Sequence, residues 1–225
     1  MTDELAEQVT GVGALMEPAR RALYLYVVGQ AEPVSREQAA NALDLPLHSA
    51  KFHLDRLVSD GLLDVEFRRL SGRSGPGAGR PSKLYQRSSR EFSVSLPERR
   101  YDIAGEVMAA AIDRAMRDAV PIDQAVREEA EEAGRRIAAD CADGMPGSLD
   151  RLCQALVRNG YEPRSRDSDI HLANCPFDRL AGRHTELVCG MNLALVRGLV
   201  EGVGVRGIVP ELAPEPGSCC VRLRG

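Results

Sequence analysis

Residues 35–86 have the sequence SREQAANALDLPLHSAKFHLDRLVSDGLLDVEFRRLSGRSGPGAGRPSKLYQ, and this stretch decides how the chain is organised. Ser35 is a favourable N-cap, and Gln38 stands where its capping-box partner belongs. Together they predict a helix that runs to about Leu43. Pro46 then requires a break, because proline is tolerated only in the first turn of the next helix.

The second helix, expected over 47–60 and ended by Gly61, has an apolar stripe and an exposed face. The stripe consists of Ala50, Leu54, Leu57 and Val58. The candidate base-contacting residues off this stripe are His48, Ser49, Lys51, Phe52 and Arg56. In a DNA major groove, Lys51 or Arg56 could donate to guanine. Phe52 has two open interpretations: contact with a thymine methyl group, or a place in the core of a slightly rotated helix.

The residues after this helix pair predict a β-hairpin, with strands over 62–70 and 83–86 and a Gly/Ser/Pro-rich loop over 71–81. The charged residues within 67–87 are all basic, although the chain has a net charge of -4. This local excess is typical of phosphate contact. The residues assigned to phosphate contact are Arg68, Arg73, Arg80 and Lys83. Arg80 could also reach a narrow minor groove.

Residues 35–86 resemble the winged helix-turn-helix of ArsR-like bacterial repressors. Gly-Ala-Gly-Arg-Pro-Ser-Lys-Leu-Tyr at 77–85 resembles the wing of the SufR-type subgroup. The resemblance implies a repressor that binds double-stranded DNA. We expect a homodimer on a palindromic operator, because one recognition helix contacts only a few base pairs. The alternative is an ordinary helical hairpin whose arginines solvate a loop, but the order of elements and the charge placement favour DNA binding.

The composition predicts a soluble globular chain with room for two domains. It has 225 residues, of which 44% are hydrophobic and 28% charged. No stretch approaches the roughly 18 to 20 consecutive apolar residues that cross a membrane. The first fifteen residues lack the cationic start of a secretory signal. We therefore expect a cytoplasmic protein without a membrane partner, whose six cysteines are thiols or metal ligands rather than disulfides.

The predicted fold class is α+β, in three segments. They are a winged helix-turn-helix domain over 1–96, a helical connector or dimerisation segment over 97–146, and a cysteine-containing sensor domain over 147–225. In the first segment we expect a frayed start over 1–15, a helix over 17–28 and a short strand over 92–96.

The connector is predicted to form helices over 101–118 and 122–140. Residues 102–143 contain eleven acids against five arginines, so this segment is not expected to lie on DNA. Its stripe of small apolar residues suits either a dimer interface or packing within the monomer. In the sensor domain the patterns predict helices over 148–159 and 185–202, and strands over 161–166, 170–174, 205–212 and 220–223.

The chemistry of the sensor domain is concentrated in Cys175, Cys189, Cys219 and Cys220. Zinc fits this spacing less well than an iron-sulfur cluster, because structural zinc sites usually use close cysteine pairs that are absent here. Asn-Cys-Pro at 174–176 and Leu-Val-Cys at 187–189 again resemble SufR-type repressors. The resemblance implies that Cys175, Cys189 and Cys219 hold a [4Fe-4S] cluster. Cys220, His171 or His184 could complete the site.

Two other functional classes remain open at this point. The first is a metal-free regulator that senses thiol redox state through Cys219 and Cys220, or that binds a small ligand in an apolar pocket. The second is an enzyme, which is not expected. Cys189 and His184 do not share a helix face, and there is no Walker or Rossmann motif. Cys141 and Cys153 lie in helical patterns and suit buried free thiols.

Overall fold

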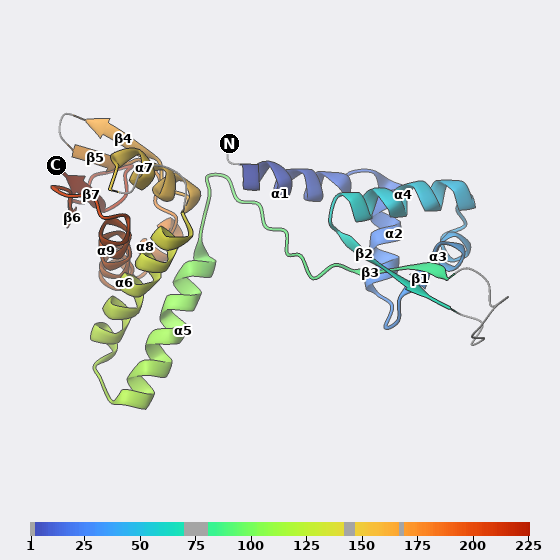
Figure 1. Cartoon of the computed structure of the whole chain (residues 1–225), viewed down its shortest axis with the longest axis horizontal. Helices are drawn as coiled ribbons and strands as arrows, with labels where there is room; N and C mark the ends of the chain where they lie inside the picture. Colours follow the sequence, from blue (N-terminus) through green and yellow to red (C-terminus); the bar gives the residue numbers. More distant parts are fainter. Residues whose placement is uncertain (1–2, 70–80, 142–146, 167–168) are drawn as a thin grey trace. The chain divides into compact units, whose positions relative to one another are not determined.

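A computed structural model describes residues 3–69, 81–141, 147–166 and 169–225 (Figure 1). The chain divides into two compact units, Met1–Val94 and Ser95–Gly225. Each unit has its own hydrophobic core and its own antiparallel sheet. The predicted mixture of helices with small sheets is therefore confirmed.

The N-terminal unit packs its helices against a small sheet of order β1-β3-β2. Its helices are α1 (Asp3–Ala14), α2 (Pro18–Val28), α3 (Arg36–Ala42) and α4 (Leu47–Ser59). Its strands are β1 (Val34–Ser35), β2 (Leu63–Arg68) and β3 (Ser82–Arg87). The core contains Leu23 of α2 with Leu54 and Leu57 of α4, all fully buried. The predicted helix pair and hairpin are thus present in the expected order.

The helix starts follow from local hydrogen bonds. The Ser35 hydroxyl accepts a bond of 3.2 Å from the Gln38 N–H, and the Gln38 side chain accepts one of 2.9 Å from the Ser35 N–H, so the predicted capping box is formed. Glu17 caps α2 by accepting from the backbone of Ala19 and Arg20. Gly61 follows α4 with a φ of 77°, a left-handed conformation that favours glycine.

Two predictions for this unit are wrong, and they concern two segments that contact each other. The start of the chain was expected to fray but forms α1, whereas residues 92–96 were expected to form a strand and do not. The Gln8 side chain of α1 accepts the Ser93 N–H at 2.9 Å, which replaces a strand partner. Phe92 lies over Gly11, where an added Cβ would approach its ring to 2.1 Å. Contacts between distant segments therefore order both.

The C-terminal unit joins a helical layer to a four-stranded sheet of order β4-β5-β7-β6. Its helices are α5 (Tyr101–Asp118), α6 (Ile122–Asp140), α7 (Leu149–Arg158), α8 (Asp178–Ala181) and α9 (Thr185–Val203). Its strands are β4 (Pro163–Arg166), β5 (Asp169–Leu172), β6 (Val209–Leu212) and β7 (Val221–Arg224). Helices α5 and α6 form a hairpin whose turn lies away from the sheet (Figure 1). These two helices share the core of this unit.

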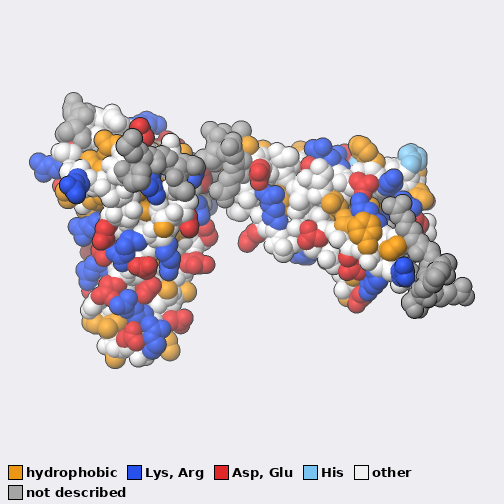
Figure 2. All heavy atoms as spheres, viewed as in Figure 1, with side chains coloured by type: hydrophobic (Ala, Val, Ile, Leu, Met, Phe, Trp, Pro, Cys, Tyr) orange, Lys and Arg blue, Asp and Glu red, His pale blue; other side chains and the backbone are white. Residues whose placement is uncertain are grey.

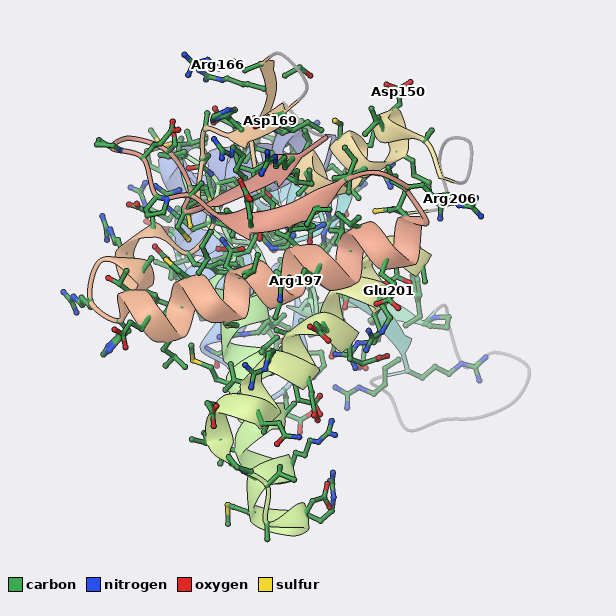
Figure 3. The ribbon with its side chains drawn as sticks, turned by 90° about the vertical axis from the view of Figure 1, so that its left-hand side faces the viewer. Asp150, Arg166, Asp169, Arg197, Glu201 and Arg206 are labelled. Atoms are coloured by element: carbon green, nitrogen blue, oxygen red, sulfur yellow. The ribbon has the colours of Figure 1, made fainter. Side chains whose placement is uncertain are left out.

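Helices α6 and α9 approach so closely that glycine is required at the contact. A Cβ at Gly198 would lie 1.9 Å from the Glu131 carbonyl oxygen, and one at Gly134 would lie 2.1 Å from that of Leu195. At the edge of this contact, Arg135 pairs with Glu201 at 3.0 Å. Figure 3 shows Arg197 and Glu201 along α9, beneath the strands of the sheet. The packing makes α9 a fixed element of this unit.

Candidate nucleic-acid interface and thiol cluster

The exposed face of α4 carries most of the predicted base-contacting side chains. His48, Lys51 and Arg56 are exposed, and Ser49 is half-buried. Phe52 is 64% exposed, so the core interpretation of this residue is wrong. Its ring packs edge-on against that of His53, with the ring centroids 5.3 Å apart. The face is therefore mixed in character, because it exposes an aromatic ring together with cationic side chains.

The hairpin of β2 and β3 carries Arg68 and Lys83, the two residues predicted to contact phosphates that lie within the described part of the chain. Arg68 pairs with Glu66 at 3.1 Å and with Glu32 at 3.5 Å. Phe67 lies opposite Lys83 in the ladder and is 67% exposed, a second exposed aromatic that the sequence analysis did not single out. Arg73 and Arg80 lie outside the described residues.

Asp55 joins the second helix of the pair to the hairpin. Its carboxylate accepts a hydrogen bond of 2.8 Å from the Tyr85 hydroxyl and also pairs with the Lys83 ammonium. Burial opposes ionisation of Asp55, but these two donors outweigh it and lower its pKa. Burial and the bond to Asp55 raise the pKa of Tyr85. Lys83 is therefore paired with an acid. Arg56 is also paired, with Asp60 at 3.0 Å.

The four cysteines of the sensor segment come together in the C-terminal unit. Cys175 follows β5, Cys189 lies in the second turn of α9, and Cys219 and Cys220 precede β7. The Cys219 thiol lies close enough to those of Cys175 and Cys220 to shift their electrostatics, and the Cys220 thiol stands in the same relation to that of Cys189. We call these four residues the thiol cluster. No short sequence motif encodes it, because three separate segments contribute.

Backbone hydrogen bonds hold the Cys219–Cys220 segment in place. The Cys219 N–H donates to the Leu172 carbonyl at 2.8 Å, and the Cys220 carbonyl accepts from Ala213 at 2.8 Å. These bonds tie the segment before β7 to the end of β5 on one side and to the residue after β6 on the other.

The Cys175 segment is held by a side-chain network. The Arg99 guanidinium donates to the Cys175 carbonyl at 2.9 Å and to the Asn174 side-chain oxygen. The Asn174 amide in turn donates to the carbonyls of Gly160 and Glu98. Arg99 and Asn174 are positioning residues that the sequence analysis missed, since their bonds span distant parts of the chain.

Several N–H groups lie near the sulfur atoms. The backbone N–H of Phe177 lowers the pKa of Cys175, and that of Val221 lowers the pKa of Cys219. The Asn192 side-chain amide donates to the Cys219 sulfur at 3.1 Å. A neutral thiol is a weak acceptor and an anionic sulfur is a stronger one. These donors therefore suit sulfurs that carry negative charge, as metal and iron-sulfur ligands do.

The environment raises the pKa of three of the thiols, those of Cys175, Cys189 and Cys219. Contact with Cys219 and then burial raise the pKa of Cys175. For Cys219, the Cys175 contact lowers the pKa, but the Cys220 contact and burial outweigh it and raise the pKa to about 11. Burial also raises the pKa of Cys189. A bound cation is one way to offset this cost, because ligation requires the thiolate.

The other candidate ligands lie apart from these interactions. The His171 ring nitrogen is 3.7 Å from Glu215, and His184 is exposed before the first turn of α9. Cys141 is buried at the end of α6, and Cys153 lies on α7. Among the described residues, no three His, Cys, Asp or Glu side chains are arranged to hold a single metal ion as they stand.

Residues 15–66, which span α2 to β2, match the family model of a helix-turn-helix domain. No curated protein and no solved structure matches the chain. The match and the observed α3–α4 pair confirm the predicted helix-turn-helix domain, which supports a DNA-binding transcription regulator. Such regulators typically have no enzymatic activity. No helix in the described ranges combines the length and the apolar character needed to span a bilayer.

Proposed function

We propose that the chain is a repressor of the SufR type that binds a palindromic DNA operator as a homodimer, and whose operator affinity depends on a [4Fe-4S] cluster. The observation that carries the proposal is the thiol cluster, together with the Asn192 amide that donates to the Cys219 sulfur. Widely separated cysteines that converge in space are a ligand pattern of iron-sulfur proteins. Cys175, Cys189 and Cys219 would be ligands, and Cys220 would be the fourth.

The chain's own residues explain how ligation could affect the fold. When bound, the cluster supplies a redox-sensitive charge and a cross-link among the segments that carry its ligands. The Cys175 segment, α9 and the segment before β7 otherwise meet through thiol contacts and a few hydrogen bonds. Ligation would hold α9 to the sheet at one end, whereas Gly198 and Gly202 hold its other end against α6.

The dimer contact is proposed for the end of the α5–α6 hairpin. Ile112, Met116 and Ile122 expose 51%, 80% and 51% of their surfaces there. Ile112 and Met116 are four residues apart on α5, so they share one face. The hairpin surface around them carries both acids and arginines (Figure 2), which makes a second copy a better partner than DNA. A dimer fixed in this way would couple half-site spacing to the state of the C-terminal unit.

The experiment is purification without oxygen, followed by the visible absorption spectrum, the iron and sulfide content, and operator binding by mobility shift. We expect a coloured protein whose chromophore is lost in Cys175→Ser, Cys189→Ser and Cys219→Ser, with operator affinity shifted in the same direction in all three. Cys141→Ser and Cys153→Ser are the matched controls and should retain both properties. Full iron content in the three variants, or its loss with unchanged DNA binding, would overturn cluster control.

A second candidate is a metal-free regulator that senses thiol redox state. The specific observation in its favour is the contact of Cys175 with Cys219 and of Cys220 with Cys189, which brings the thiols together without a metal. A colourless protein after anaerobic purification, with operator binding that changes on thiol oxidation, would select this candidate. Sedimentation of a stable monomer, both free and on the operator, would contradict the proposed dimer in either case.

A further inference from the structure

Asn192 is a buried polar residue in the middle of an otherwise apolar helix. Its side chain lies at 0% exposure on the face of α9 that also buries Val188, Leu195 and Leu199. A buried amide is costly unless each of its polar atoms finds a partner. The partners of Asn192 therefore indicate what the amide does.

Asn192 connects a tyrosine to the thiol cluster. Tyr161, a residue that is 2% exposed, donates through its hydroxyl to the Asn192 side-chain oxygen, and the Asn192 side-chain nitrogen donates to the Cys219 sulfur at 3.1 Å. The tyrosine thus fixes which end of the amide faces the sulfur. An amide N–H directed at a neutral thiol recovers little of its desolvation cost, whereas one directed at an anionic sulfur recovers much more.

We infer that Asn192 is a positioning residue that stabilises Cys219 as an anionic ligand for a soft cation, with Tyr161 fixing the orientation of its amide. The inference rests on the proposed function, in which the thiol cluster binds metal. It adds that the four sulfurs are not equivalent, because among the described residues the Asn192 amide donates to the sulfur of Cys219. Hydrogen bonds to ligand sulfurs tune both metal affinity and redox potential.

The test uses Cd²⁺ as the probe on the full-length apoprotein, with the ultraviolet absorption of the thiolate–metal bond as the readout. Each ligating thiol loses its proton to solvent when the Cd–S bond forms. Asn192→Asp keeps the size and the acceptor for Tyr161 but replaces the N–H donor with a carboxylate oxygen. We expect the Cd²⁺ affinity to fall about tenfold to a hundredfold, which corresponds to about 1.4 to 2.8 kcal/mol.

Two further variants separate this effect from misfolding. Tyr161→Phe combined with Asn192→Leu removes both polar partners and leaves an apolar core, so the fold should survive while the Cd²⁺ affinity still falls. Asn159→Asp is the matched control, because the Asn159 amide is also buried but donates to the Ala155 carbonyl at 2.8 Å. Its Cd²⁺ affinity should equal that of the wild type even if its unfolding temperature drops.

The outcomes distinguish this inference from the proposed function. If the wild type binds Cd²⁺ through thiolates and both Asn192 variants bind it equally tightly, the role of Asn192 is refuted while metal binding stands. If the wild type forms no thiolate–metal bond, both ideas fail. The inference also requires that Asn192→Asp causes no further change in Cd²⁺ affinity when Cys219→Ser is present, because the sulfur that accepts the Asn192 amide is then gone.

Discussion

Replacing Asp55 with asparagine should weaken the fold and strengthen DNA binding at the same time. Asp55 on α4 accepts from Tyr85 and pairs with Lys83, and both partners lie on β3. The asparagine keeps the shape of the side chain and can still accept from Tyr85, but it removes the negative charge. Lys83 is then free to approach a phosphate, and one acid is removed from the proposed DNA-facing surface.

The magnitudes follow from the exposure of the three side chains. A hydrogen bond to a charged group contributes about 1.5–3 kcal/mol, and Tyr85 is only 1% exposed, but the Asp55 side chain is 38% exposed, so solvent screens part of this bond. The Lys83 pair is more than a third exposed on both sides and contributes about 0.2–1 kcal/mol. Because a neutral bond to Tyr85 remains, we expect a loss of about 1–2 kcal/mol in the free energy of unfolding.

The assay combines urea unfolding, followed by circular dichroism, with duplex binding over a series of salt concentrations. One freed cation should steepen the slope of log affinity against log salt by about 0.9. Asp64→Asn is the control, because it removes an exposed carboxylate of β2 that pairs with no cation among the described residues. An unchanged slope in Asp55→Asn would show that Lys83 does not face DNA, and unchanged stability would refute the role of Asp55 in the fold.

Three other predictions concern helix packing, base contact and pH. Gly198→Ala should lower the free energy of unfolding by at least about 1–3 kcal/mol, because its Cβ would lie 1.9 Å from a backbone oxygen. Gly190→Ala on the same helix is the control, since its Cβ meets nothing within 4 Å, and equal unfolding temperatures of the two variants would contradict the close helix contact. Lys51→Ala and Arg56→Ala should change the order of preference among operator variants measured by mobility shift, and an unaltered order would show that neither side chain contacts bases. Burial and the hydrogen bond to Asp55 raise the pKa of Tyr85. The contribution of the Tyr85 hydroxyl to stability should therefore be complete below the usual tyrosine pKa of about 10 and be lost as pH rises through the pKa in the folded state. An alkaline ultraviolet titration in which Tyr85→Phe removes no late-titrating phenol would refute this prediction.

The sequence by itself determined the helix-turn-helix and its hairpin. The Ser35–Gln38 capping box and the Ala50–Leu54–Leu57 stripe of α4 depend on residues within one or two helical turns of each other. Such short-range hydrogen bonding and periodicity can be recognised without knowing the rest of the fold. The bounds of α5 and α6 were predictable for the same reason, because Pro121 separates two strongly periodic segments.

Only the tertiary structure decided which distant residues meet. It ordered α1 through Gln8 and Phe92, and it placed Phe52 in solvent rather than in the core. It also neutralised part of the basic hairpin by pairing Lys83 with Asp55. No local pattern encodes these contacts, since each depends on how separate elements pack.

The thiol cluster shows most clearly what the sequence determines and what only the tertiary structure determines. The sequence identified Cys175, Cys189, Cys219 and Cys220 as candidates, but their spacing alone could not establish that they meet. The one local sign of Asn192 was a polar residue in an apolar helix, and its meaning depended on finding Tyr161 and Cys219 at either end of its amide. Residue chemistry is fixed by the sequence, whereas hydrogen-bond partners across the core are fixed by the packing of α9 against the sheet and the segment before β7.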